Sequence, residues 1–528
     1  MSIRRPASIL ACLALLAGGA APAAGQTATL PAPSPAPTLA LSPLFADHAV
    51  LQRDRLLPVW GTAAPGETVT VRFHHQAAQG VAGPDGRWLV RLGAQPASSE
   101  PAELAVTGRT TVTVHDLVVG DLWVCSGQSN MEFKVDDGGT TYHVDNARAE
   151  IAAARFPLIR QLEVERAVAG SPAAGFASQG WKAATPGNVG HFTAVGYFFA
   201  RDIHRAVGVP IGLILTCWGG TPVEAWMNQS ARASTTLSAK IDSRWQQALA
   251  EWPPERVAQY PAAKAAWDKA EAEAAAQHTH NTLPWPHPPA TGTSPDLPGG
   301  LFNAMIAPLQ PAAVRGFLWY QGESNTGHAD EYAELFGAMI RSWRVGFAQG
   351  DLPFYFVQLA NYGVGRGATG RDWAALRDAQ TQTLALPATG MAVTIDIGSA
   401  DNIHPRNKQE VGRRLALLAR ASIYGVPPES RGPQLAFAAV EGKAIRVHFT
   451  HAGDELEAHG GSPSALELAG ADRVFQPAMG TVDVDTLVVT SPLVPAPVAV
   501  RYAWTNAPIA NLFSDDGLPV VPFRTDNW

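Results

Sequence analysis

Charged side chains are scarce in this sequence, and no segment is rich in lysine or arginine. They make up 16% of the 528 residues, and the net charge of −7 is spread thinly over that length. Proteins that bind nucleic acid or an anionic membrane surface concentrate positive charge, so we expect neither as the main partner. No apolar run of about 18 residues follows the N-terminal segment, so we expect no membrane-spanning helix in the mature chain.

Cysteine is rare, and two common functional motifs are missing. Only three cysteines occur, and the 15 histidines show no spacing typical of zinc ligands. The sequence leaves open whether Cys125 and Cys217 form a disulfide or stay reduced and buried. The pattern G-x-S-x-G does not occur, which weakens an interpretation as an ordinary α/β-hydrolase with a nucleophile elbow.

The N-terminal segment is typical of export. Arg4 and Arg5 precede an apolar run, and small residues follow up to Gly25. This order predicts a signal peptide over residues 1–25 and a periplasmic or secreted protein. Residues 26–40 are rich in proline and alanine and predict a stiff linker.

Sequence patterns divide the remaining chain into three parts. Residues 41–118 hold short β-type runs separated by turns, which predicts an N-terminal β-sandwich domain. Residues 119–425 alternate continuous apolar runs with amphipathic helical patterns, which predicts a parallel sheet covered on both faces. Within them, residues 228–300 indicate an insertion, helical and then irregular. Short β-type runs return in residues 426–528 and predict a C-terminal β-rich domain.

Candidate catalytic residues lie where the predicted parallel strands end, because such sheets bind ligands there. Ser129 follows the apolar run LWVCSG, and His404 follows the last apolar strand with Asp401 three residues before it. A serine nucleophile needs a base, and the base needs an orienting acid. Each residue alone also fits a simpler interpretation, a turn serine or a loop histidine, and Asn130 could cap a helix.

Two glycine-containing motifs follow other predicted strands. They are CWGG (217–220) and WYQGESN (319–325), where backbone N–H groups or the amide of Gln321 or Asn325 could stabilise an oxyanion. Either motif alone is better explained as a turn, but four motifs at four strand ends favour one site. GRGATG (365–370) fits G-x-G-x-x-G, yet its long loop favours a loop near the pocket over a nucleotide site.

The combined motifs resemble the sialate O-acetylesterase branch of the SGNH hydrolases. The resemblance is carried by GDLWVCSGQSNME, CWGGTPVEAWM, FNAMIAPL, GFLWYQGESN, IHPRNKQEVGRRLAL and NLFSDDGLPVVPFRTDNW. It runs from about residue 42 to the end, apart from much of 228–300. It implies an α/β fold: a three-layer SGNH-hydrolase core with a flavodoxin-like parallel sheet, flanked by β-sandwich-like domains. It also implies removal of acetyl groups from carbohydrates without a metal or cofactor.

The resemblance assigns roles to individual residues. Ser129 matches the nucleophile, His404 the base and Asp401 the partner of that base. The oxyanion would be held by the Ser129 N–H, Gly220 and Gln321, with Gly219 and Asn325 as second choices. Arg377 and Trp218 are weaker candidates for substrate binding, and Leu376 stands where the family pattern has an aromatic residue before the arginine.

The sequence therefore predicts an exported serine esterase that hydrolyses O-acetyl groups from carbohydrates through an acetyl-serine intermediate. One alternative is an acetylesterase for plant polysaccharide (xylan, xyloglucan or pectin), because the motifs describe the ester chemistry and not the sugar. Another is a non-catalytic carbohydrate-binding protein with a degenerate hydrolase core. The presence of Ser129, Asp401 and His404 argues against the second alternative. The motifs do not indicate an oligomeric state.

Overall fold

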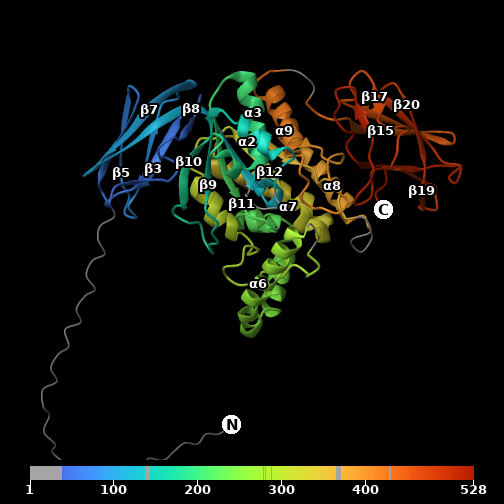
Figure 1. The fold of residues 1–528 in the computed structure, drawn as a ribbon, viewed down its shortest axis with the longest axis horizontal. Helices are drawn as coiled ribbons and strands as arrows, with labels where there is room; N and C mark the ends of the chain where they lie inside the picture. The colour runs from blue at the N-terminus through green and yellow to red at the C-terminus, as the bar shows by residue number, and fades with distance from the viewer. Residues whose placement is uncertain are drawn as a thin grey trace, which may run out of the picture. The chain divides into compact units, whose positions relative to one another are not determined.

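The structure, a computed structural model, describes residues 38–136, 143–277, 279, 281–286, 288–363, 370–426 and 430–528. The predicted signal peptide, most of the predicted linker and residues 365–369 of the GRGATG loop lie outside the described residues. The described residues form a mixed α/β fold with further β-sheets toward the C-terminus (Figure 1). The predicted α/β class is therefore confirmed at this level.

The central sheet has the strand order β10-β9-β11-β8-β12-β13-β14. Its members are β8 (Thr111–Gly127), β9 (Phe156–Val164), β10 (Ser178–Ala184), β11 (Ile211–Cys217), β12 (Gly316–Tyr320), β13 (Phe354–Val357) and β14 (Thr389–Ala392). All neighbours from β9 to β14 pair in parallel, and β10 pairs antiparallel to β9. The run β11-β8-β12-β13-β14 follows the chain order 2-1-3-4-5 of flavodoxin-like sheets. The carboxyl ends of these strands therefore meet at one edge.

Four amphipathic helices lie between or after the strands of the central sheet, as their sequence patterns predict. They are α3 (Ala194–Val207), α7 (Ala329–Phe347), α8 (Asp372–Gln382) and α9 (Lys408–Ser422). Thr193 and Asn407 accept backbone N–H bonds and cap the N-termini of α3 and α9. These two helices pack side by side (Figure 1). A Cβ on Gly412 of α9 would lie 2.6 Å from the Cβ of Phe198 on α3, so the close packing requires glycine there.

The N-terminal strands form two groups. Strands β1 (Ala40–Leu41), β3 (Leu57–Thr62) and β6 (Arg87–Leu92) make a three-stranded sheet. Strands β2 (Val50–Gln52), β4 (Thr68–Phe73), β5 (Gln76–Val81) and β7 (Ser98–Thr107) join the first half of β8 directly or through one another. The predicted domain boundary after residue 118 thus falls inside one continuous strand, and β8 carries the N-terminal sheet directly into the central one.

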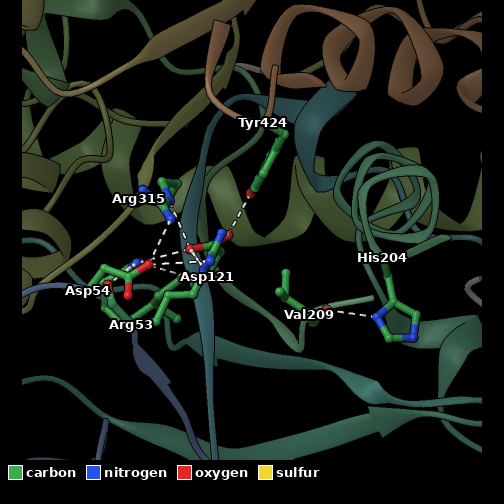
Figure 2. A network of polar contacts seen from close by, with 9 residues as sticks. Arg53, Asp54, Asp121, His204, Val209, Arg315 and Tyr424 are labelled. Atoms are coloured by element: carbon green, nitrogen blue, oxygen red, sulfur yellow. Dashed lines mark hydrogen bonds and ion pairs between the residues drawn. The ribbon is translucent and has the colours of Figure 1, made fainter. Parts of the chain in front are cut away.

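A buried carboxylate on β8 joins several segments at the point where this strand begins to pair with β11. Asp121 is fully buried and accepts hydrogen bonds from Gln52, Arg53, Arg315 and Tyr424. Figure 2 shows both guanidinium groups and the Tyr424 hydroxyl converging on this carboxylate. Burial alone would raise the pKa of Asp121, but the hydrogen bond from Arg53 and the charges of Arg315 and Arg53 outweigh it, so the pKa is lowered. The network fixes the end of the sheet opposite the catalytic candidates.

Residues 228–300, over which the sequence predicts an insertion, are helical and then irregular where the structure describes them. It contains α4 (Gln229–Ala233), α5 (Ser238–Ala250) and α6 (Pro254–Ala276), and loops follow. No helix among the described residues is long and apolar enough to cross a membrane.

The C-terminal part consists of short strands in three small sheets. These strands are β15 (Gln434–Glu441), β16 (Ala444–Thr450), β17 (Leu456–Ala458), β18 (Leu466–Ala469), β19 (Phe475–Pro477), β20 (Met479–Asp483), β21 (Thr486–Thr490), β22 (Ala499–Tyr502), β23 (Leu512–Ser514) and β24 (Phe523–Arg524). The β-rich composition predicted after residue 425 is confirmed.

Candidate active site

Ser129 lies in a tight turn directly after β8. It is the first residue of the short helix α1 (Ser129–Glu132). Gly127 has a φ of +134°, and a Cβ there would lie 2.2 Å from the Tyr320 carbonyl oxygen. The Gln128 N–H donates to the same carbonyl at 3.0 Å. Only glycine allows strand β8 to turn this closely against the end of β12, and that turn aims Ser129 out of the sheet.

His404 reaches Ser129 from the segment between β14 and α9. Its Nε2 lies 2.8 Å from the Ser129 Oγ, across 275 residues of chain. Burial, assisted by the charge of Lys408, lowers the pKa of His404 to about 3. The imidazole is therefore neutral at ordinary pH and has a lone pair that can accept the Ser129 proton.

Asp401 lies in the same turn as His404. Its carboxylate is exposed and accepts a hydrogen bond from the Ser399 hydroxyl. The turn is further held by the Asn402 side chain, whose Oδ1 accepts from the His404 N–H at 2.9 Å. The orienting role predicted for Asp401 remains a prediction.

Of the two candidate oxyanion glycines, Gly219 lies against the serine. A Cβ on Gly219 would lie 3.2 Å from the Ser129 Cβ, whereas a Cβ on Gly220 would meet open space. The Gly219 N–H donates to Glu132 Oε2 at 2.9 Å, and Glu132 also pairs with Arg166. The geometry thus favours the second choice of the sequence, Gly219, as the glycine beside the nucleophile.

The amides of Gln321 and Asn325 lie in a buried network. Gln321 Nε2 donates to the Thr221 carbonyl at 3.2 Å and to Asn325 Oδ1 at 2.7 Å. Asn325 Nδ2 donates to Glu224, and its Oδ1 also accepts from the Val223 N–H. These bonds hold the loop after CWGG in place. Both N–H donors of Gln321 are used, so an oxyanion role for Gln321 requires it to exchange one of these partners for the substrate oxygen.

Comparison with known proteins shows the family to which this chain belongs. The sialate O-acetylesterase of Rattus norvegicus is 30% identical over 525 residues, which cover 90% of this chain and 92% of the rat protein. The chain belongs to the sialate O-acetylesterase family. The human member of this family is 30% identical over 404 residues, covering 70% of this chain and 67% of the human protein. A family model described as a carbohydrate esterase, sialic acid-specific acetylesterase, matches residues 290–420.

A solved structure supports the same assignment. The crystal structure of a carbohydrate acetylesterase from Xanthomonas citri is 38% identical to this family member. It superposes with a TM-score of 0.78 and covers 93% of this chain and 100% of its own. The predicted enzyme class, a carboxylic ester hydrolase, is confirmed by these relatives.

The two residues proposed for substrate binding differ in accessibility. Trp218 is half-buried, with the Arg166 guanidinium 5.5 Å from its ring centroid. Arg377 is fully buried, and its guanidinium donates to the carbonyls of Ala503, Thr505 and Asn506. This placement corrects the expectation for Arg377, because a side chain covered by the C-terminal segment has no surface for a sugar. Burial lowers the pKa of Arg377 to about 9.

Sequence reasoning missed two charged groups close to the nucleophile. Glu132 lies three residues after Ser129, and Lys408 lies four residues after His404 at the start of α9. The sequence signal that could have identified them is their short distance along the chain from Ser129 and His404.

Cys125 and Cys217 are both free and buried, and burial raises the pKa of Cys217 to about 12. Among the described residues, no group of three or more His, Cys, Asp or Glu side chains could hold a metal ion.

Proposed function

We propose that this family member is a serine esterase that hydrolyses O-acetyl groups on carbohydrates through an acetyl-Ser129 intermediate. The observation that carries the proposal is the 2.8 Å contact between Ser129 Oγ and His404 Nε2 at the carboxyl edge of the parallel sheet. We propose further that the core is a three-layer SGNH-hydrolase domain (119–425) between two β-domains (41–118 and 426–528). The strand order 2-1-3-4-5 and the packed helix pairs support this architecture. The chain is exported to the periplasm or the medium, as residues 1–25 indicate.

In the first half-reaction, Ser129 Oγ forms a bond to the acetyl carbonyl carbon while its proton passes to His404 Nε2. The electron pair of the carbonyl moves to its oxygen, and in this proposal the backbone N–H groups of Ser129 and Gly219 stabilise that charge. Asp401 holds the imidazole and stabilises its cation. The intermediate then expels the sugar alcohol, which takes its proton from His404.

The second half-reaction repeats these steps with water. His404 takes a proton from water as the oxygen attacks the acetyl-enzyme, and Ser129 leaves with the proton that His404 returns. The products are acetate and free enzyme. For the N–H of Gly219 to reach the oxyanion, Glu132 must give up its present bond to that group. The carboxylate of Glu132 also pairs with Arg166, which offers it an alternative partner.

The sugar is the part of the proposal that the relatives leave open. The mammalian relatives are named for sialate esters, whereas the bacterial structure, at higher identity, is named only for carbohydrate esters. We place O-acetyl sialosides first and acetylated xylan, xyloglucan and pectin second. For either kind of sugar ring we propose half-buried Trp218, the residue before Gly219, as the aromatic contact.

Acetate release from these four substrates tests the proposal. Purified mature protein should release acetate from at least one of them and should cleave 4-nitrophenyl acetate. Ser99→Ala, at an exposed position on β7, serves as a matched serine control and should keep full activity. If no substrate is deacetylated and the reporter stays intact, the carbohydrate-binding alternative is favoured instead.

A further inference from the structure

A buried chain of polar groups connects the Ser129 turn with the His404 turn, and the mechanism above does not use it. Its centre is Asn130, the residue after the nucleophile. Asn130 Nδ2 donates to Glu323 Oε1 at 2.5 Å and to the Ile403 carbonyl at 3.0 Å. Asn130 Oδ1 accepts from Lys408 Nζ at 2.5 Å. Both N–H donors of the Asn130 amide are therefore used, and the bond to the Ile403 carbonyl joins the backbone before His404 to the helix that carries Ser129.

Lys408 is an unusual member of this chain, because lysine is rarely buried completely. It is fully buried, and its ammonium lies 4.9 Å from the ring centroid of Phe133 and 5.1 Å from that of Tyr320. The two aromatic faces and the Asn130 oxygen replace the water that a lysine normally keeps. Burial lowers the pKa of Lys408 to about 7, although the nearby charge of Glu323 opposes this effect. A leucine or methionine would fill this space without such a cost, so the charge itself needs an explanation.

We propose that Lys408 is a positioning residue for the esterase reaction, whose ammonium aligns the Ser129 and His404 turns through Asn130 and sets the electrostatic surroundings of His404. The inference rests on the proposed function, because it gives Ser129 and His404 their roles. Two consequences follow from the two parts of the proposal. Loss of the N–H donor at position 408 releases Asn130, and loss of the positive charge makes protonation of the imidazole easier.

The charged and titratable groups around this pair come from three elements. Asp401 lies in the His404 turn, Glu323 faces Asn130 from η5 (Glu323–His328), and Tyr320 faces the ammonium from β12. Burial raises the pKa of Glu323, and its Oε2 is buried with no hydrogen-bond partner. Burial also raises the pKa of Tyr320, so that it stays neutral. Lys408 is thus the group in this set whose positive charge acts on His404.

Two variants separate position from charge. Lys408→Met removes the N–H donor and the charge, whereas Lys408→Gln removes the charge but keeps a donor for Asn130. With 4-nitrophenyl acetate, kcat should fall by about 10- to 100-fold in Lys408→Met and by less in Lys408→Gln, with KM little changed. In both variants the acid limb of the kcat/KM profile should move to higher pH by roughly one unit. Lys443→Gln, in the turn between β15 and β16, is the control for net charge and should leave the limb in place.

The result that overturns the inference is a wild-type acid limb in a folded Lys408→Gln protein, because a merely structural lysine would not move it. If Lys408→Met does not fold by circular dichroism, Lys408→Gln alone decides. Ser129→Ala, assayed in the same series, separates the two proposals. Retained turnover in Ser129→Ala refutes the proposed function, whereas its loss together with an unshifted limb in the Lys408 variants refutes only the role of Lys408.

Discussion

Replacing Asp121 by alanine should destabilise the protein strongly, although the residue lies far from the chemistry. The carboxylate is fully buried and accepts from Gln52 at 3.1 Å, from Arg53 at 3.0 and 3.1 Å, and from Arg315 and Tyr424 at 2.8 Å each. Removing one partner of a buried ion pair costs about 3–5 kcal/mol, because the other charge stays buried and unpaired. The Arg53 and Arg315 side chains keep 20% and 17% of their surface exposed and can regain some water. We therefore expect Asp121→Ala to lower the free energy of unfolding by an amount at the lower end of this range, about 3 kcal/mol.

The loss of stability in Asp121→Ala should depend on pH in a defined direction. Since the pKa of Asp121 is lowered in the folded state, its stabilising contribution is complete above the ordinary value of 3.8 and is lost as the pH falls below it. Urea unfolding followed by tryptophan fluorescence, with calorimetry as a second probe, measures the difference from wild type at pH 7 and pH 3. Asp485→Ala, at an exposed turn between β20 and β21, is the matched control and should change stability by less than about 0.5 kcal/mol. An Asp121→Ala protein as stable as this control at pH 7 would refute the reasoning.

Three further predictions concern the site and its supports. The acid limb of the kcat/KM profile of the wild-type enzyme should lie below pH 6.5, because burial lowers the pKa of His404 and the imidazole stays neutral as the pH falls. An acid limb at or above pH 6.5 would contradict this effect of burial. Gly127→Ala should cost more than about 1 kcal/mol in urea unfolding and should reduce kcat, because its Cβ meets the Tyr320 carbonyl; wild-type values for both would show that the turn tolerates a side chain. Arg377→Met should cost about 3 kcal/mol by leaving the buried carbonyls of Ala503 and Asn506 unpaired, and it should speed proteolysis of the C-terminal segment. An effect confined to KM would restore a substrate role for Arg377.

The sequence predicted the meeting of Ser129 and His404 because both follow apolar strands of one parallel sheet. The carboxyl ends of such strands share an edge, so strand-length apolar runs determine which loops converge even when 275 residues separate them. The helices α3, α7, α8 and α9 were predictable for a related reason, since their apolar residues recur at the helical period.

Other features could not be predicted, because they depend on what packs against a residue. The first half of β8 has one partly exposed face and the second half is buried throughout, so the pattern changes near residue 118 while the strand continues. The domain boundary predicted from that change of pattern therefore falls within a continuous strand. Arg377 matched a motif of pocket residues, but the carbonyls of the segment at 503–506 cover it. The burial of Lys408 could not be predicted either, because a lysine in the first turn of an amphipathic helix is usually solvated.

The central claim is that Ser129 carries the acetyl group during turnover, and trapping that group tests it most directly. The enzyme is mixed with an acetyl-ester substrate, quenched in acid within the first turnover and analysed by peptide mass spectrometry, with Ser129→Ala and Ser99→Ala in parallel. We predict one acetyl group on the peptide containing Ser129 in wild type and in Ser99→Ala, and neither an acetyl group nor turnover in folded Ser129→Ala. Turnover by Ser129→Ala at the wild-type rate, or an acetyl group on another residue, would contradict the account.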